Sequence, residues 1–205
     1  KRLGNTIDPF MAVEKYGADA IRWYMLSNAA PWDNLKFDLD GVTETQRKFF
    51  GTLHNTYGFY ALYANIDEFK NDHEEISIDQ RTELDQWILS KLNSLSKLVE
   101  DAMDDYEPTK ATRAIQSFVI NDLSNWYVRL NRRRFWKGEL TSDKIAAYQT
   151  LNTCLINISK LMCSFSPFYA DNLYRDLTFS DESVHLQDFP TANSGLINPE
   201  LESQI

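Results

Sequence analysis

The residues best suited to chemistry lie in one short stretch, 125–137, which interleaves cations with indole rings and side-chain amides. The candidates are Asn125, Trp126, Arg129, Asn131, Arg132, Arg133, Trp136 and Lys137. A guanidinium fork matches a phosphate or a base edge, and an aromatic face stacks on an unpaired base. An amide can exchange hydrogen bonds with a base. The stretch therefore predicts a site for a polyanion such as a single-stranded nucleic acid.

The charge distribution also indicates a local site. The chain has 21 basic and 30 acidic side chains and a net charge of −9. Residues 108–137 hold seven basic side chains and one acidic one, whereas residues 67–107 hold four basic and thirteen acidic ones. One basic segment in an acidic chain is typical of a local binding site rather than a generally basic surface. We expect nonspecific nucleic-acid binding to be weak and easily lost in salt.

The same segment has a helical apolar pattern. Its apolar residues recur every three or four positions: Ala111, Ile115, Phe118, Val119, Leu123, Trp126 and Leu130. This spacing predicts a helix packed into a core. Asp122, Arg129 and Arg133 fall on or beside the same stripe, so the two guanidiniums must be paired or face a ligand. Alternatively, the arginines are simply favoured by the dipole at a helix C-terminus.

Other kinds of chemistry find no support in the residue pattern. The three histidines, His54, His73 and His185, are not at the spacing of a metal site or a catalytic triad. Cys154 and Cys163 lie in an apolar helical pattern, which indicates buried thiols rather than a disulfide or a metal site. Nothing in the sequence argues for catalysis by this chain alone.

The elements that must position the basic stretch are predicted to be helices. Asp8 and Pro9 give a helix start and Gly17 a stop. Apolar periodicity places helices at residues 9–16, 18–27, 43–66, 84–106, 109–137, 142–166 and 167–177. Residues 29–42 are expected to form a connector, with a short strand possible at 35–38.

Long helices with brief connections predict an all-α, antiparallel helical bundle. We expect three parts: a short helical unit with its connector at 1–42, the bundle at 43–190, and a loose tail at 191–205. No stretch has the length of an apolar membrane span, and the basic start lacks the apolar run of a signal peptide. A cytoplasmic protein is therefore expected. The start in a basic loop without methionine suggests a piece of a longer protein.

Three parts of the sequence carry a family resemblance. Residues 1–9, KRLGNTIDP, and 16–22, YGADAIR, resemble the segment that closes the catalytic domain of class I aminoacyl-tRNA synthetases of the isoleucine, valine, leucine and methionine group. Residues 125–136, NWYVRLNRRRFW, resemble the isoleucyl-tRNA synthetases in particular. The pattern at 167–190 resembles the end of that family's helical anticodon-binding domain.

The resemblance implies roles for residues near the start. Lys1 and Arg2 would be the last residues of a KMSKS-type loop, where both bind ATP and Lys1 is catalytic in the full enzyme. ATP and magnesium are expected for that enzyme. The nucleotide-binding fold, the HIGH-type motif and any editing insertion are absent from this sequence, so no cofactor and no metal are expected in this chain. Residues 1–42 would contact the stem of the tRNA.

The leading hypothesis is that the chain is the tRNA-recognition part of an isoleucyl-tRNA synthetase. It would bind the anticodon region of isoleucine tRNA, be inactive alone and adjoin the catalytic domain of the same polypeptide. Contacts to phosphate carry no sequence information, so Asn131 and one arginine are the preferred candidates for reading a base.

Two alternatives remain open at this stage. The chain could be the same domain of a valyl-tRNA synthetase, which the run from Trp126 to Trp136 disfavours. It could instead be a helical protein-interaction module, in which Arg129 and Arg133 pair internally with carboxylates such as Asp122. Charge reversal at Arg133 separates these hypotheses, because a buried pair would lose stability whereas a surface contact would lose only binding.

Overall fold

The structure is a computed structural model, which describes residues 6–136 and 138–205. In these ranges every regular element is a helix, which confirms the all-α prediction. The α-helices are α1 (Pro9–Tyr16), α2 (Ala18–Asn28), α3 (Leu39–Thr45), α4 (Gly51–Ile66), α5 (Glu83–Asp104), α6 (Pro108–Ser117), α7 (Arg129–Trp136), α8 (Ser142–Met162), α9 (Pro167–Thr178) and α10 (Pro199–Gln204). Two π-helical segments, η1 (Gln46–Phe50) and η3 (Phe118–Val128), join α3 to α4 and α6 to α7. Short 3₁₀ turns are η2 (Ile78–Gln80), η4 (Val184–Leu186) and η5 (Ser194–Leu196).

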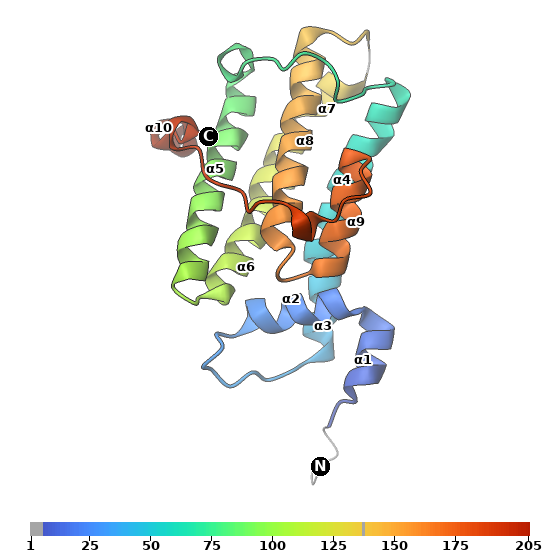
Figure 1. The fold of residues 1–205 in the computed structure, drawn as a ribbon, viewed down its shortest axis with the longest axis vertical. Coiled ribbons are helices and arrows are strands. Elements are labelled where there is room, and N and C mark those ends of the chain that lie inside the picture. The colour runs from blue at the N-terminus through green and yellow to red at the C-terminus, as the bar shows by residue number, and fades with distance from the viewer. Residues whose placement is uncertain (1–5, 137) are drawn as a thin grey trace.

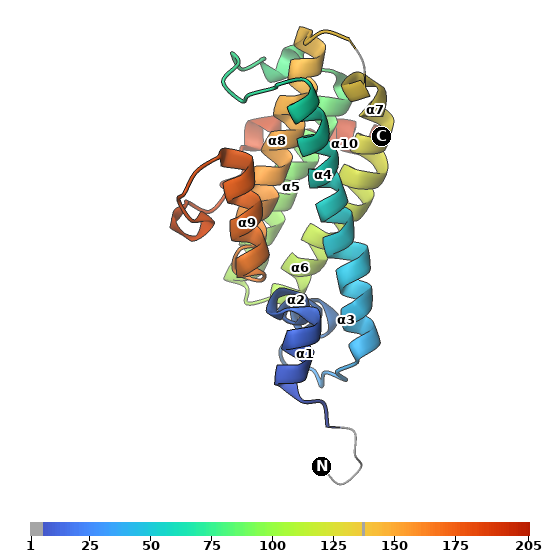
Figure 2. The same cartoon turned by 90° about the vertical axis from the view of Figure 1, so that its right-hand side faces the viewer.

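The long helices stand side by side as a bundle (Figure 1). It consists of α4, α5, α8 and the continuous helix from α6 through η3 to α7, with α9 packed on α8. The small helices α1, α2 and α3 lie at one end of the bundle, below α6 and α9 in Figure 1. Figure 2 shows α4 and the α6–α7 helix on one side and α9 on the other.

Local capping residues define where several helices begin and end. Asp8 accepts hydrogen bonds from the first turn of α1, and Gly17 ends that helix with a φ of 76°. Thr82 and Asp85 form a reciprocal capping box at the start of α5, and Thr141 caps α8. These side chains satisfy backbone groups that a helix end leaves unpaired.

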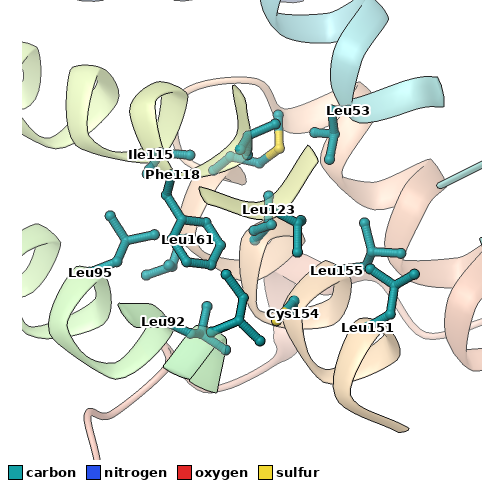
Figure 3. Packing of buried hydrophobic residues seen from close by; sticks show 14 of the residues in the cluster. Leu53, Leu92, Leu95, Ile115, Phe118, Leu123, Leu151, Cys154, Leu155 and Leu161 are labelled. Atoms are coloured by element: carbon teal, nitrogen blue, oxygen red, sulfur yellow. The ribbon is translucent and has the colours of Figure 1, made fainter. Parts of the chain in front are cut away.

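The core is filled by large side chains from all the long helices. Figure 3 shows Leu92 of α5, Leu123 of η3 and Leu155 of α8 converging between the helices, and each is buried. Toward α7 the core becomes aromatic: the ring of Phe135 lies 5.1 Å from that of Phe59 and 5.0 Å from that of Tyr148. This packing fixes α7 against both α4 and α8.

Hydrogen bonds attach the N-terminal helices to the bundle. The Arg22 guanidinium donates to the carbonyls of Phe165 and Ser164 in the turn between α8 and α9, both at 3.0 Å. The Arg113 guanidinium of α6 donates to carbonyls at the end of α2. A carboxylate oxygen of Asp19 accepts from the backbone N–H of Tyr169 in α9 at 2.6 Å. Contacts from three directions therefore hold α2 in place.

Two expectations about the connecting segments need correction. Residues 35–38 lie in no strand, because no second extended segment lies beside them in the described ranges. Helix α3 begins at Leu39, inside the expected connector, where the side chain of Asp38 caps it. The expected boundary between residues 42 and 43 therefore lies inside a helix.

The expectation of a loose tail at 191–205 is wrong. The Leu201 side chain of α10 is buried against α5, and Glu202 accepts hydrogen bonds from Ser90 at 2.5 Å and Ser94 at 2.7 Å. The Ser90 hydroxyl also accepts from the backbone N–H of Asn198. Polar contacts hold this segment, so a search for apolar periodicity could not reveal it. None of the helices in residues 6–136 and 138–205 is long and apolar enough to cross a membrane.

Substitution of Leu201 tests how firmly the C-terminal segment is attached. We expect Leu201→Ala to lower the free energy of unfolding by about 1–3 kcal/mol, at the low end for a buried leucine because the site is peripheral. The matched control is Gln204→Ala, which changes an exposed residue in the same helix. Urea denaturation of both variants measures the difference. Equal stability of the two would contradict the packing of α10.

Candidate nucleic-acid interface

The outer face of α7 carries three cations and an indole ring. Arg129, Arg132, Arg133 and Trp136 recur at spacings of three and four residues, and all are exposed. Because α7 is α-helical, these spacings place them on one face. Within the described ranges, none of the three guanidiniums forms an ion pair. The face is therefore free to bind an anion.

The π-helical segment η3 sets which side chains reach this face. The sequence pattern predicted that Trp126 and Leu130 would point inward, but they are 42% and 54% exposed. An i→i+5 hydrogen-bond pattern puts more residues in a turn than the 3.6 of an α-helix, so the apolar register shifts along η3. Tyr127 and Val128 are buried instead. The wider turn thus brings Trp126 to the surface just before α7.

The shift of the apolar register along η3 also means that the prediction for the charged residues on the apolar stripe was wrong. Arg129 and Arg133 do not lie on the buried face, and Asp122 pairs with neither of them. Asp122 is half-buried, and its carboxylate lies 3.9 Å from the ammonium of Lys91. Burial raises the pKa of Asp122, while the charge of Lys91 opposes the change.

Arg134 is the arginine that pairs internally. Its two terminal nitrogens donate to the two oxygens of Asp85, at 2.8 and 2.9 Å, in a bidentate contact. It also donates to the carboxylate of Asp143 in α8, at 2.8 and 3.1 Å. Burial opposes ionisation of Arg134, but its hydrogen bonds and the charge of Asp85 raise its pKa above the ordinary value. Arg134 therefore joins α7 to the N-terminal ends of both α5 and α8.

Asp85 is fully buried and has further partners. Its carboxylate accepts from the Tyr127 hydroxyl at 2.5 Å and from the Thr82 hydroxyl at 2.8 Å. Burial, together with the neighbouring carboxylate, raises the pKa of Tyr127 well above its usual value, so the tyrosine remains a neutral donor. Every partner that a buried carboxylate needs is supplied from within the fold.

The prediction that Asn131 reads a base needs correction. Asn131 is only 5% exposed, its amide nitrogen donates to the carbonyl of Tyr127, and its amide oxygen accepts from Arg134, both at 3.0 Å. Its hydrogen-bonding groups are used inside the protein. Asn125, by contrast, is exposed at the end of η3.

Of the other predicted site residues, Trp136 is 51% exposed at the end of α7. Lys137, Lys1 and Arg2 lie outside the described residues. The structure thus brings Asn125, Trp126, Arg129, Arg132, Arg133 and Trp136 to one surface region and removes Asn131 from it. Sequence reasoning missed the role of Arg134. The spacing of Thr82 and Asp85 is that of a capping box, a signal of a helix start, but this spacing does not show that Asp85 is buried.

One concave surface outside α7 is poorly suited to a polyanion. A hollow of about 540 Å³ beside the start of α8 is lined by Glu74, Glu75 and Asp143, whose negative charges would repel phosphate. In the part of the chain that the structure describes, no three histidine, cysteine or acidic side chains are grouped so as to hold a metal ion.

Comparison with known proteins shows which family the chain belongs to. Residues 85–205 match the family described as the anticodon-binding domain of tRNA ligase. The chain belongs to this family. Over its whole length it is 60% identical to an isoleucine–tRNA ligase of Porphyromonas gingivalis and 61% identical to one of Cytophaga hutchinsonii. It covers only 18% and 19% of these relatives, about a fifth of their length.

A solved structure supports the fold independently. The chain is similar to the LeuRS in a ternary complex of Agrobacterium radiobacter K84 agnB2 LeuRS, tRNA and LeuAMS, with a TM-score of 0.70 and 20% identity. The match covers 97% of this chain and 22% of the LeuRS chain. These comparisons confirm both the resemblance to the isoleucyl-tRNA synthetases and the helical fold of an anticodon-binding domain.

Substitution of Arg134 and of Arg133, one at a time, tests whether Arg134 is paired inside the fold and Arg133 is not. Arg134→Met leaves the buried Asp85 without its cation, so we expect the free energy of unfolding to fall by about 3–5 kcal/mol. Arg133→Met changes an exposed, unpaired neighbour and should alter stability by less than about 0.5 kcal/mol. Chemical denaturation measures both. A similar loss in the two variants would show that the pairing assigned to Arg134 is wrong.

Proposed function

We propose that the exposed face of α7 binds the anticodon region of an isoleucine tRNA. The observation that carries the proposal is the free state of Arg129, Arg132 and Arg133, which form no ion pair within the described residues. Guanidiniums without carboxylate partners on an otherwise acidic chain favour a polyanionic ligand. Membership in an anticodon-binding family makes tRNA the ligand of choice.

The side chains divide the binding between them. The three arginines can donate to phosphate oxygens and so position the RNA. Trp126 and Trp136 expose about half of their indole surfaces near the two ends of the basic face, where unpaired bases can stack. Asn125 offers an exposed amide for a base edge. Base selection then rests on Asn125 and one arginine rather than on the whole basic run.

The whole protein would be an isoleucine–tRNA ligase of the cytoplasm. Its relatives are isoleucine–tRNA ligases, of which this chain matches about a fifth. Attachment of isoleucine would use ATP and magnesium in the catalytic domain of the same polypeptide. Lys1 and Arg2, as the end of a KMSKS-type loop, would bind ATP there, with Lys1 stabilising charge on the phosphates. The described residues would contribute recognition of the tRNA, and the chain alone would be inactive.

The internal pairing expected of an interaction module is found at a different arginine. Arg134, not Arg129 or Arg133, is held by carboxylates: the buried one of Asp85 and the exposed one of Asp143. The exposed arginines thus have no structural partner that would explain them. This favours tRNA binding over a role in protein–protein contact.

Neutralisation of an exposed arginine tests the proposal. We expect Arg133→Gln to weaken binding of isoleucine tRNA about tenfold, or about 1.4 kcal/mol, with an unchanged melting temperature. Loss of a phosphate contact should also reduce the slope of log K against log salt by about one.

The control is Lys97→Gln, which removes an exposed cation from α5, about three turns from the capping box. Its affinity and salt slope should match those of the unmodified chain. Binding is measured by fluorescence anisotropy at several salt concentrations. Equal losses in the two variants would mean that any surface cation contributes and that α7 is not the site.

A further inference from the structure

Acidic residues are rare in the helices of one side of the bundle. Residues 46–66, which form η1 and α4, and residues 108–136, which form α6, η3 and α7, together contain one acidic side chain, Asp122. Helix α5 alone contains five. Since α4 contacts η3, these helices form one continuous side, which Figure 2 shows at the right. On a chain with 30 acidic residues, this segregation calls for an explanation.

A line of polar, uncharged side chains runs along this side from the basic face. Ser117, Asn121 and Asn125 are exposed at intervals of four residues, and Arg129 continues the series. Residues four apart lie close together on a helix surface, so the series follows one line along the helix. The amide nitrogen of Asn121 donates to the Ser117 hydroxyl oxygen at 3.1 Å, which shows that the two lie side by side. We call Ser117 and Asn121 the polar ridge; Asn125, proposed above to contact a base, joins it to the basic face.

The polar ridge connects two parts of the molecule. One end meets the cations of α7 through Asn125. One turn beyond the other end, Arg113 donates to the carbonyls of Ser27 and Asn28 at the end of α2, at 2.7 and 2.9 Å. The ridge therefore extends from the proposed anticodon site toward the N-terminal helices. Asn121 lies twelve residues from Arg133, at most about 18 Å at the rise of an α-helix.

We propose that the polar ridge contacts the sugar–phosphate backbone of the anticodon stem, the double-stranded RNA next to the loop bound at α7. This rests on the proposed function. Hydroxyl and amide groups can donate to phosphates and 2′-hydroxyls without reading sequence. Short side chains let a backbone come close. Asp122, which is half-buried, is the one carboxylate on these helices, so phosphates would meet less repulsion here than on α5. The ridge thus extends the interface from the loop to the stem.

Isosteric charge insertion tests the ridge. Asn121→Asp places a negative charge on it, and Asn172→Asp makes the same change at an exposed site on α9, on the other side of the bundle. The probes are a hairpin with the stem and loop of the isoleucine anticodon arm and an oligonucleotide of the loop alone. We expect Asn121→Asp to weaken hairpin binding about fivefold or more and loop binding less than twofold. Asn172→Asp should change neither.

A second variant, Asn121→Lys, separates an effect of charge on binding from an effect of Asn121→Asp on folding. A cation at the same position should strengthen hairpin binding, whereas the anion of Asn121→Asp weakens it. If the substitutions only disturbed folding, there would be no reason for the two variants to change affinity in opposite directions. The proposed stem contact would be contradicted if both Asn121 variants bound the hairpin as tightly as the unmodified chain. It would also be contradicted if Asn121→Asp lost equal affinity for the hairpin and the loop oligonucleotide. Arg133→Gln should weaken both probes. If Arg133→Gln weakens binding of neither RNA, the proposed function of α7 fails as well. If Arg133→Gln weakens binding and the Asn121 variants do not, only the stem contact fails and the proposed function of α7 is retained.

Discussion

The buried ion pair between Asp85 and Arg134 sets the position of α7 in the bundle, and the proposed interface depends on that position. Removing a carboxylate from water costs several kcal/mol, and only complete pairing offsets that cost. Here the fork of Arg134 and the hydroxyls of Tyr127 and Thr82 supply the pairing. The contact joins α7 to the start of α5 and, through Asp143, to the start of α8. It thereby fixes the rotation of α7 about its own axis.

That rotation decides what the other arginines can do. With Arg134 turned inward, Arg129, Arg132 and Arg133 must point to solvent, where no described carboxylate neutralises them. Arg134 therefore anchors α7 to the bundle, and the other three arginines expose their positive charges to solvent. The same helix continues through η3 and α6 to the attachment of α2, so the basic face and the N-terminal helices belong to one packed structure.

Much of the fold follows from local signals, but the site depends on features that they do not contain. The stop at Gly17 and the cap at Thr141 are read directly from residue type. The π-helical turn of η3 cannot be found with a 3.6-residue period, so Trp126 was assigned to the core although it is exposed. The burial of Asn131 and the choice of Arg134 depend on helices far away in sequence. The C-terminal segment is held on α5 partly by hydrogen bonds to Glu202, and such polar contacts produce no periodic spacing of apolar residues in the sequence.

The proposed function is recognition of isoleucine tRNA through its anticodon. The most direct measurement compares binding of isoleucine tRNA with binding of a copy whose anticodon has been changed, over a range of salt concentrations. The account predicts that isoleucine tRNA binds tighter by more than about 1.4 kcal/mol, a factor of ten, and that the difference persists as salt rises. Equal binding of the two RNAs, lost together in salt, would contradict it.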